Sequence, residues 1–122
     1  MRKILFRGYN ENRKWIYGML EQSNLTNRYS ICNMQDGVSY LVNESSIGQY
    51  TGFNDKNGKE IYEGDIVKYC GCKLKVLFSE KIGQWLMYAD DGSAKERLCN
   101  NLTMTEIIGN VYEEKLKEKE RI

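Results

Sequence analysis

Two tight-turn signals near the middle of the chain constrain its fold more than any other feature. The segment Tyr50–Tyr69 contains the turn pairs Asn57-Gly58 and Glu63-Gly64, with apolar and aromatic residues around both. The chain has no proline, so every turn depends on Gly, Asn, Asp or Ser. We interpret the segment as the connection into a small barrel, with Gly58, Gly64 and Asp65 as structural turn residues and a positive φ at Gly64.

Alternation of apolar and polar residues on both sides of this segment predicts short strands. The N-terminal half contains two predicted hairpins: Lys3–Tyr9 with Trp15–Leu20, and Arg28–Cys32 with Val38–Val42. Asn43–Ser46 predicts either one helical turn or a plain link. The strands predicted for the C-terminal half are Asp65–Tyr69, Lys73–Phe78, Gln84–Tyr88, Ala94–Cys99 and Glu106–Tyr112, with an irregular or 3₁₀ step at residues 100–105.

Five short, closely spaced strands with a one-turn step before the last are typical of an SH3-like barrel. The predicted fold class is therefore mainly β, or α+β at most. An N-terminal β-hairpin lobe (residues 1–48) is joined to a C-terminal SH3-like small barrel (residues 49–112), and a short charged tail (residues 113–122) follows. Glu113 and Lys117 are four residues apart, which predicts a frayed surface helix in the tail.

Charge and composition exclude several function classes. The chain has 18 basic and 17 acidic residues, a net charge of +1, which argues against nucleic-acid binding through bulk charge. It has no histidine, the commonest general base and metal ligand. The apolar run Ile4–Phe6 is too short for a signal peptide or a membrane span, so we expect a cytoplasmic protein with no membrane partner. Its four cysteines are then expected to be free, buried thiols.

Three segments match the sequence pattern of a known family. The central one is Gln49–Val67, the first is Arg2–Arg7, and the last is Glu106–Glu113. Together they resemble the YopX family of phage and prophage proteins. The chain departs from the family pattern at Gly8-Tyr9, where Ala-Trp is common, and at Lys115, where proline is frequent. From the first departure we expect the N-terminal hairpin to pack somewhat differently from the family pattern.

The resemblance implies a two-lobed, β-rich fold whose C-terminal part is an SH3-type barrel. It also implies an origin in a temperate phage of a Gram-positive host. It brings no established activity and no catalytic residues. We therefore predict no enzyme, no cofactor and no metal.

Two polar groupings have structural interpretations that outweigh the functional ones. Cys70-Gly71-Cys72 has one residue between its thiols, whereas structural zinc sites have pairs two to four apart and four ligands in all. Glu60, Glu63 and Asp65 form an acidic cluster, but a turn carboxylate that accepts backbone N–H bonds, beside solvated glutamates, explains it. Residues 55–59 lack the alternating acids of a calcium loop.

A basic and aromatic group is the candidate binding surface. It consists of Lys68, Lys73, Lys75, Trp85 and Tyr88, with Lys81 as a further member of the basic stripe. Lysines on the outer face of a strand also prevent edge pairing, and tyrosine is an ordinary β-former, so most of the rings are expected in the core. The first hypothesis is an accessory protein that binds a host or phage protein, or its own copies. The alternative is a nucleic-acid-binding module.

Overall fold

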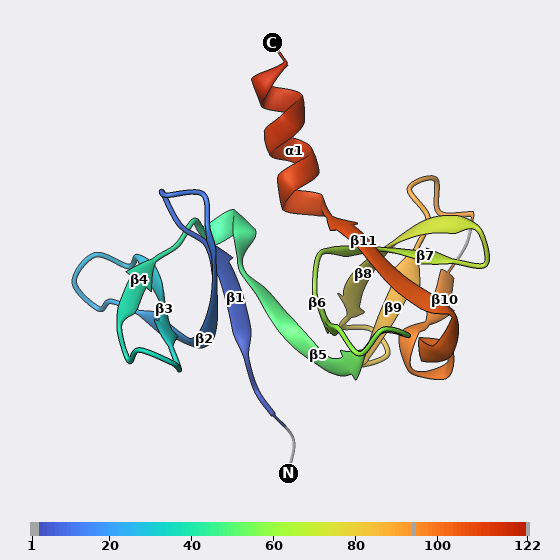
Figure 1. Cartoon of the computed structure of the whole chain (residues 1–122), viewed down its shortest axis with the longest axis horizontal. Coiled ribbons are helices and arrows are strands. Elements are labelled where there is room, and N and C mark those ends of the chain that lie inside the picture. The colour runs from blue at the N-terminus through green and yellow to red at the C-terminus, as the bar shows by residue number, and fades with distance from the viewer. Residues whose placement is uncertain (1–2, 94, 122) are drawn as a thin grey trace. The chain divides into compact units, whose positions relative to one another are not determined.

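The computed structural model describes residues 3–93 and 95–121. It confirms the mainly β class: the strands form two antiparallel sheets, with short 3₁₀ turns and one α-helix (Figure 1). The chain divides into two compact units, Met1–Tyr50 and Thr51–Ile122. The predicted ranges 1–48, 49–112 and 113–122 stay predictions.

The first unit consists of two hairpins whose strands pair side by side in the order β4-β3-β2-β1-β5. The elements are β1 (Phe6–Tyr9), β2 (Trp15–Gln22), β3 (Tyr29–Asn33), β4 (Ser39–Leu41), η1 (Glu44–Ser46) and the start of β5 (Gly48–Asn54). Both predicted hairpins are therefore present. The segment after β4 adopts the helical alternative, because the Asn43 side chain accepts the Ser45 N–H and begins the 3₁₀ turn η1.

Close packing explains two glycines of the first unit. A Cβ on Gly18 would lie 1.9 Å from the carbonyl oxygen of Cys32, and one on Gly8 would lie 2.7 Å from the Val42 side chain. Gly8 belongs to Gly8-Tyr9, the first of the two places at which the chain departs from the family pattern. Val42 occupies the space of its missing side chain, so this departure has a packing explanation within the unit.

The central segment contains two strands where the sequence indicated mainly turns. β5 pairs with β1 at Gly48 and Gln49 and borders β6 (Glu60–Tyr62). Between β5 and β6, Asp55 begins a tight turn in which the N–H of Gly58 donates to the Asp55 carbonyl, 2.9 Å away. Gly58 has the positive φ (+80°) that such a turn needs.

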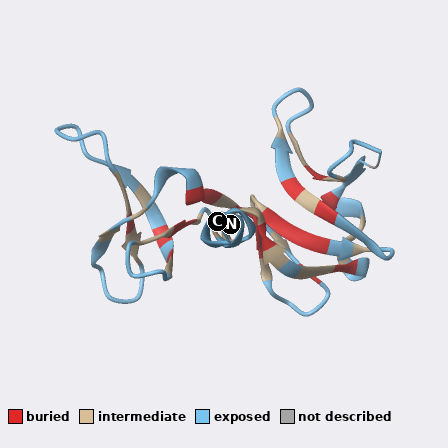
Figure 2. Cartoon of the chain, turned by 90° about the horizontal axis from the view of Figure 1, so that it is seen from above, coloured by how far each residue is buried: buried red, intermediate tan, exposed pale blue. Residues whose placement is uncertain are grey.

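The second unit is built on a five-stranded sheet of order β10-β9-β8-β7-β11. Its strands are β7 (Asp65–Tyr69), β8 (Cys72–Ser79), β9 (Gln84–Tyr88), β10 (Lys95–Arg97) and β11 (Thr105–Asn110). One face is apolar because side chains alternate along each strand. Its buried Val67, Leu74, Val76 and Met87 form the core together with Ile61 of β6 and with Leu98, which follows β10 (Figure 2).

β10 and β11 are the two edges of this sheet, and no pairing joins them among the residues that the structure describes. A closed SH3-like barrel is therefore not seen, and the barrel stays a prediction. The β11 edge is covered by the turn that begins at Asp55. The Lys56 N–H donates to the Thr105 carbonyl (2.9 Å) and the Ile107 N–H donates to the Asp55 carboxylate (3.0 Å).

Two predicted strand boundaries were wrong at the C-terminal end. β10 ends at Arg97, because Leu98 begins the 3₁₀ turn η2 (Leu98–Asn100), which is followed by η3 (Leu102–Met104); Ala94 lies outside the described residues. β11 ends at Asn110 rather than at Tyr112. The Asn110 side chain accepts the Glu113 N–H at 2.8 Å, and this N-cap starts α1 (Val111–Glu120).

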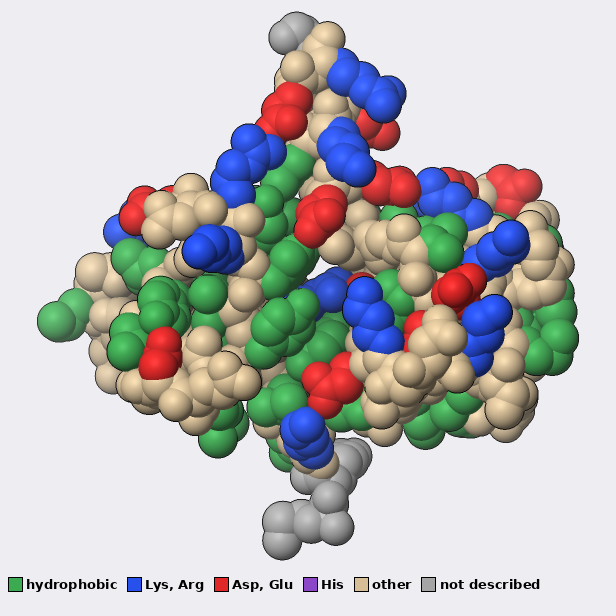
Figure 3. Space-filling view, viewed as in Figure 1, with side chains coloured by type: hydrophobic (Ala, Val, Ile, Leu, Met, Phe, Trp, Pro, Cys, Tyr) green, Lys and Arg blue, Asp and Glu red, His purple; other side chains and the backbone are tan. Residues whose placement is uncertain are grey.

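The helix α1 confirms the predicted helix in the tail and begins two residues earlier. It buries no residue, and its apolar side chains Val111, Tyr112 and Leu116 are half-buried. Acidic residues lie in its first turn and lysines in its last, which suits the helix dipole. Figure 3 shows these side chains of both signs mixed along its length.

Candidate functional site

The predicted lysines lie together on the face of the second sheet opposite its core. Lys68 on β7 pairs directly with Lys73 on β8, and Lys75 follows two residues later on the same side. We call Lys68, Lys73 and Lys75 the lysine row. Lys75 also pairs with Tyr88 on β9, which in turn pairs with Lys95 on β10. Four of the five predicted surface residues are thus brought to one face.

Two members of the lysine row are held by carboxylates that the sequence did not single out. Lys73 Nζ lies 2.9 Å from Glu114 of α1, and Lys75 Nζ lies 2.9 Å from Asp90 after β9. The Glu114 carboxylate raises the pKa of Lys73, and the Lys75 ammonium lowers the pKa of Asp90. All four side chains are substantially exposed, so each pair adds little to stability.

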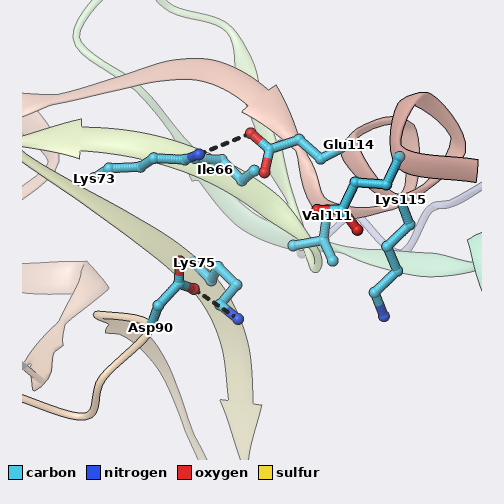
Figure 4. A pocket seen from close by; sticks show the side chains of 8 residues that line it. Ile66, Lys73, Lys75, Asp90, Val111, Glu114 and Lys115 are labelled. Atoms are coloured by element: carbon cyan, nitrogen blue, oxygen red, sulfur yellow. Dashed lines mark ion pairs between the residues drawn. The ribbon is translucent and has the colours of Figure 1, made fainter. Parts of the chain in front are cut away.

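A small hollow of about 180 Å³ lies between the lysine row and α1 (Figure 4). Ile66 and Val111 supply its apolar lining. Charged side chains of both signs supply the rest: Lys73, Lys75, Lys115, Asp90, Glu114 and Glu118. The hollow combines an apolar surface with three ammonium groups, two of which are already paired.

Trp85 does not join this face. It pairs with Phe78 across β8 and β9, three positions along from the pair Lys75–Tyr88. Because side chains alternate between the two faces, an odd number of positions places Trp85 on the core side. The Phe78 and Trp85 rings meet edge to face with centroids 5.0 Å apart, and Trp85 packs against the core. Lys81 is also separate, because it lies in the turn between β8 and β9. The predicted basic and aromatic group is therefore split.

The end of the β8–β9 hairpin forms a second surface, which we call the apolar hairpin end: Phe78, Ile82 and Trp85. Phe78 is 42% exposed, and Ile82, in the turn, is 47% exposed. The signal in the sequence was the aromatic pair on either side of an Ile-Gly turn. Sequence reasoning used only Trp85, because it assigned faces to the strand that contains Phe78 but not to the strand Gln84–Tyr88.

The predicted turn residues have structural roles. Gly64 has φ +90°, its N–H donates to the Val76 carbonyl (2.8 Å), and its own carbonyl accepts the Val111 N–H (2.8 Å). Gly64 therefore connects the start of β7 to both β8 and α1. Asp65 is buried, and its carboxylate accepts the Tyr62 N–H at 2.8 Å, as the structural interpretation predicted.

Replacing Gly64 with alanine is expected to lower the free energy of unfolding by about 1–3 kcal/mol, because an L residue at this φ is strained. Gly92→Ala is the matched control. Gly92 also has a positive φ (+74°) but lies in an exposed turn that can relax, so a cost of about 1 kcal/mol is expected. Urea denaturation measures both, and equal losses would contradict the role of Gly64 at the junction of β7, β8 and α1.

Asp55 is a buried carboxylate with several backbone partners, and sequence reasoning considered it only as part of a calcium loop, which it rejected. It is 6% exposed and accepts three backbone N–H bonds, from Asn57 (2.9 Å), Lys59 (2.9 Å) and Ile107 (3.0 Å). Burial alone would raise the pKa of Asp55, but these N–H groups and the Lys59 ammonium lower it overall. Through its bond with the Ile107 N–H, Asp55 connects its turn to β11.

The cysteines are free, as predicted, but the prediction that they are buried was wrong. Cys70, Cys72 and Cys99 are exposed and Cys32 is half-buried. Cys70 (φ +51°) and Gly71 (φ +79°) form the two-residue turn between β7 and β8, which sets Cys70 at the surface. Within residues 3–93 and 95–121, no three His, Cys, Asp or Glu side chains are arranged to hold a metal ion. The same residues contain no helix long and apolar enough to span a membrane.

The fold and these two surfaces define a two-unit, mainly β protein with exposed charged and apolar faces. Its sequence matches a family described as YopX protein over residues 5–116. The chain therefore belongs to the YopX family, as its three sequence segments indicated. No curated protein matches it.

Proposed function

We propose that this chain is a phage or prophage accessory protein that acts in the cytoplasm by binding a host or phage protein, without catalysis of its own. The YopX family supports the phage connection. Interference with host metabolism or with antiviral defence is one form that such binding takes, and self-association is another.

The observation that carries this proposal is the apolar hairpin end. Phe78 is 42% and Ile82 47% exposed, although both are apolar side chains next to the half-buried Trp85. Aromatic residues that project from a rigid element are typical anchors of protein interfaces. The β8–β9 ladder holds Phe78 and Trp85 in place, because it pairs residues continuously from Lys75–Tyr88 to Ser79–Gln84, and Ile82 lies in the turn that this last pair closes.

An affinity pull-down from host lysate, with and without nuclease, tests the proposal. A nuclease-resistant protein partner is expected, and the variants Phe78→Ser and Ile82→Glu should each lower its capture at least about tenfold, as hot-spot substitutions do. Ile108→Glu is the matched control, because Ile108 is 52% exposed on β11, away from the hairpin turn in the chain. If both hairpin variants captured the partner as well as the wild type does, the apolar hairpin end would not be the binding surface.

A further inference from the structure

We propose that the lysine row is a binding site for single-stranded nucleic acid and that Glu114 of α1 is a built-in competitor for it. This site is separate from the apolar hairpin end. It uses the opposite face of the sheet and a different class of ligand.

The row extends into a basic surface across four strands. Beside Lys68, Lys73 and Lys75, the same face presents Lys95 and Arg97 on β10 through the pairs Tyr88–Lys95 and Leu86–Arg97. Neighbouring strands are about 4.8 Å apart, and alternate residues on one strand about 7 Å apart. The cations are therefore spaced closely enough to follow a phosphate backbone.

Tyr88 favours a nucleic acid over an acidic protein segment. Its ring is half-buried and lies among these cations, with Lys75 paired on one side and Lys95 Nζ 5.8 Å from its centroid on the other. An acidic peptide would bind through the ammonium groups alone and would not need the ring. Proteins that bind single strands combine cations along the backbone with an aromatic ring on which a base stacks.

The contact from α1 is suited to displacement. The Lys73–Glu114 pair is about half exposed on both sides, and α1 buries no residue. In the hollow beneath α1, loss of Glu114 from Lys73 would leave the ammonium groups of Lys73, Lys75 and Lys115 facing one volume. About 180 Å³ equals roughly six water molecules, which is room for a phosphate group. Asp90 and Glu118 also line this volume and limit the affinity.

Binding of a fluorescent oligothymidine to the full chain tests the proposal. One phosphate contact from each of the three residues of the lysine row predicts a slope of about −2 in a plot of log K against log salt concentration. The affinity should therefore fall roughly 20-fold from 50 to 200 mM salt. Glu114→Gln should bind about two- to fivefold more tightly, the scale of an exposed ion pair. The double variant K73A/K75A should lose at least about tenfold, since two of the three contacts are gone.

Two controls make the result decisive. Glu80→Gln removes the same charge from the turn between β8 and β9 and should leave affinity unchanged; tightening equal to that of Glu114→Gln would overturn the role of α1. Poly-glutamate should bind at least tenfold more weakly than the oligonucleotide. Equal binding of poly-glutamate, or no oligonucleotide binding at low salt by either the wild type or Glu114→Gln, would overturn the site. The substituted side chains are surface residues, and circular dichroism checks that each variant is folded.

Discussion

Asp55→Ala is expected to lower the free energy of unfolding of the second unit by about 3 kcal/mol at neutral pH, because it leaves three backbone N–H groups without their carboxylate. Two of these bonds shape the turn before β6, and the third secures β11. The chain has two tryptophans, and Trp85 belongs to the second unit. Urea denaturation followed by Trp85 fluorescence in a Trp15→Phe background measures this unit.

The same carboxylate predicts an acid-sensitive part of the stability. The pKa of Asp55 is lower in the folded chain than the value of about 3.9 expected in the unfolded chain. Its stabilisation is therefore complete above about pH 4 and is lost as pH falls through the folded-state pKa. The difference between wild type and Asp55→Ala should be largest at neutral pH and shrink on acidification.

Asp91→Ala is the control for the Asp55 prediction. Asp91 also accepts a backbone N–H, from Ser93 at 2.8 Å, but it is exposed and makes a local turn only. Its replacement should cost less than about 1 kcal/mol. A loss for Asp55→Ala no larger than that for Asp91→Ala would show that the bond to β11 is not needed.

Gly18→Ala is expected to destabilise the first unit by about 3 kcal/mol or more. The new Cβ would lie 1.9 Å from the Cys32 carbonyl oxygen, which is backbone and moves only if β3 moves. The β2–β3 pairing should then be lost or shifted. Fluorescence of Trp15, in a Trp85→Phe background, reports the unfolding of this unit.

A glycine in the other sheet provides the comparison. Gly109 lies within β11, and a Cβ there would meet no atom within 4 Å. Gly109→Ala should change the free energy of unfolding by less than about 1 kcal/mol. If Gly18→Ala were tolerated equally well, the close approach of β2 and β3 would not be a constraint on the fold.

Much of the strand pattern could be predicted because it depends on local chemistry. The strand Asp65–Tyr69 and the strand Gln84–Tyr88 were predicted with the bounds that the structure has, since turn residues frame an alternating apolar run on each side. The end of β11 could not be predicted in this way, because Val111 and Tyr112 are good strand residues. The strand ends at Asn110 because the Asn110 side chain caps the charged helix α1, which takes in both of these residues.

The candidate surface was predicted in composition but not in arrangement. Lys68, Lys73, Lys75 and Tyr88 share one face of the sheet, and Trp85 lies on the other, because a shift of one residue in strand phase moves a side chain to the other face. Glu114 carried no signal at all in the sequence as a partner of Lys73. The two are 41 positions apart, and only the path of the chain from β11 into α1 joins them.

By itself the sequence determined the mainly β class, the places of most turns and membership of the YopX family. These follow from residue types and spacing, which act over a few neighbouring positions. Only the tertiary structure decided which carboxylates hold the lysines, that Asp55 secures β11, and that Phe78 and Trp85 lie on the face opposite the lysine row. Those contacts join residues far apart in the chain, and they depend on strand register and on the order of strands in the sheet.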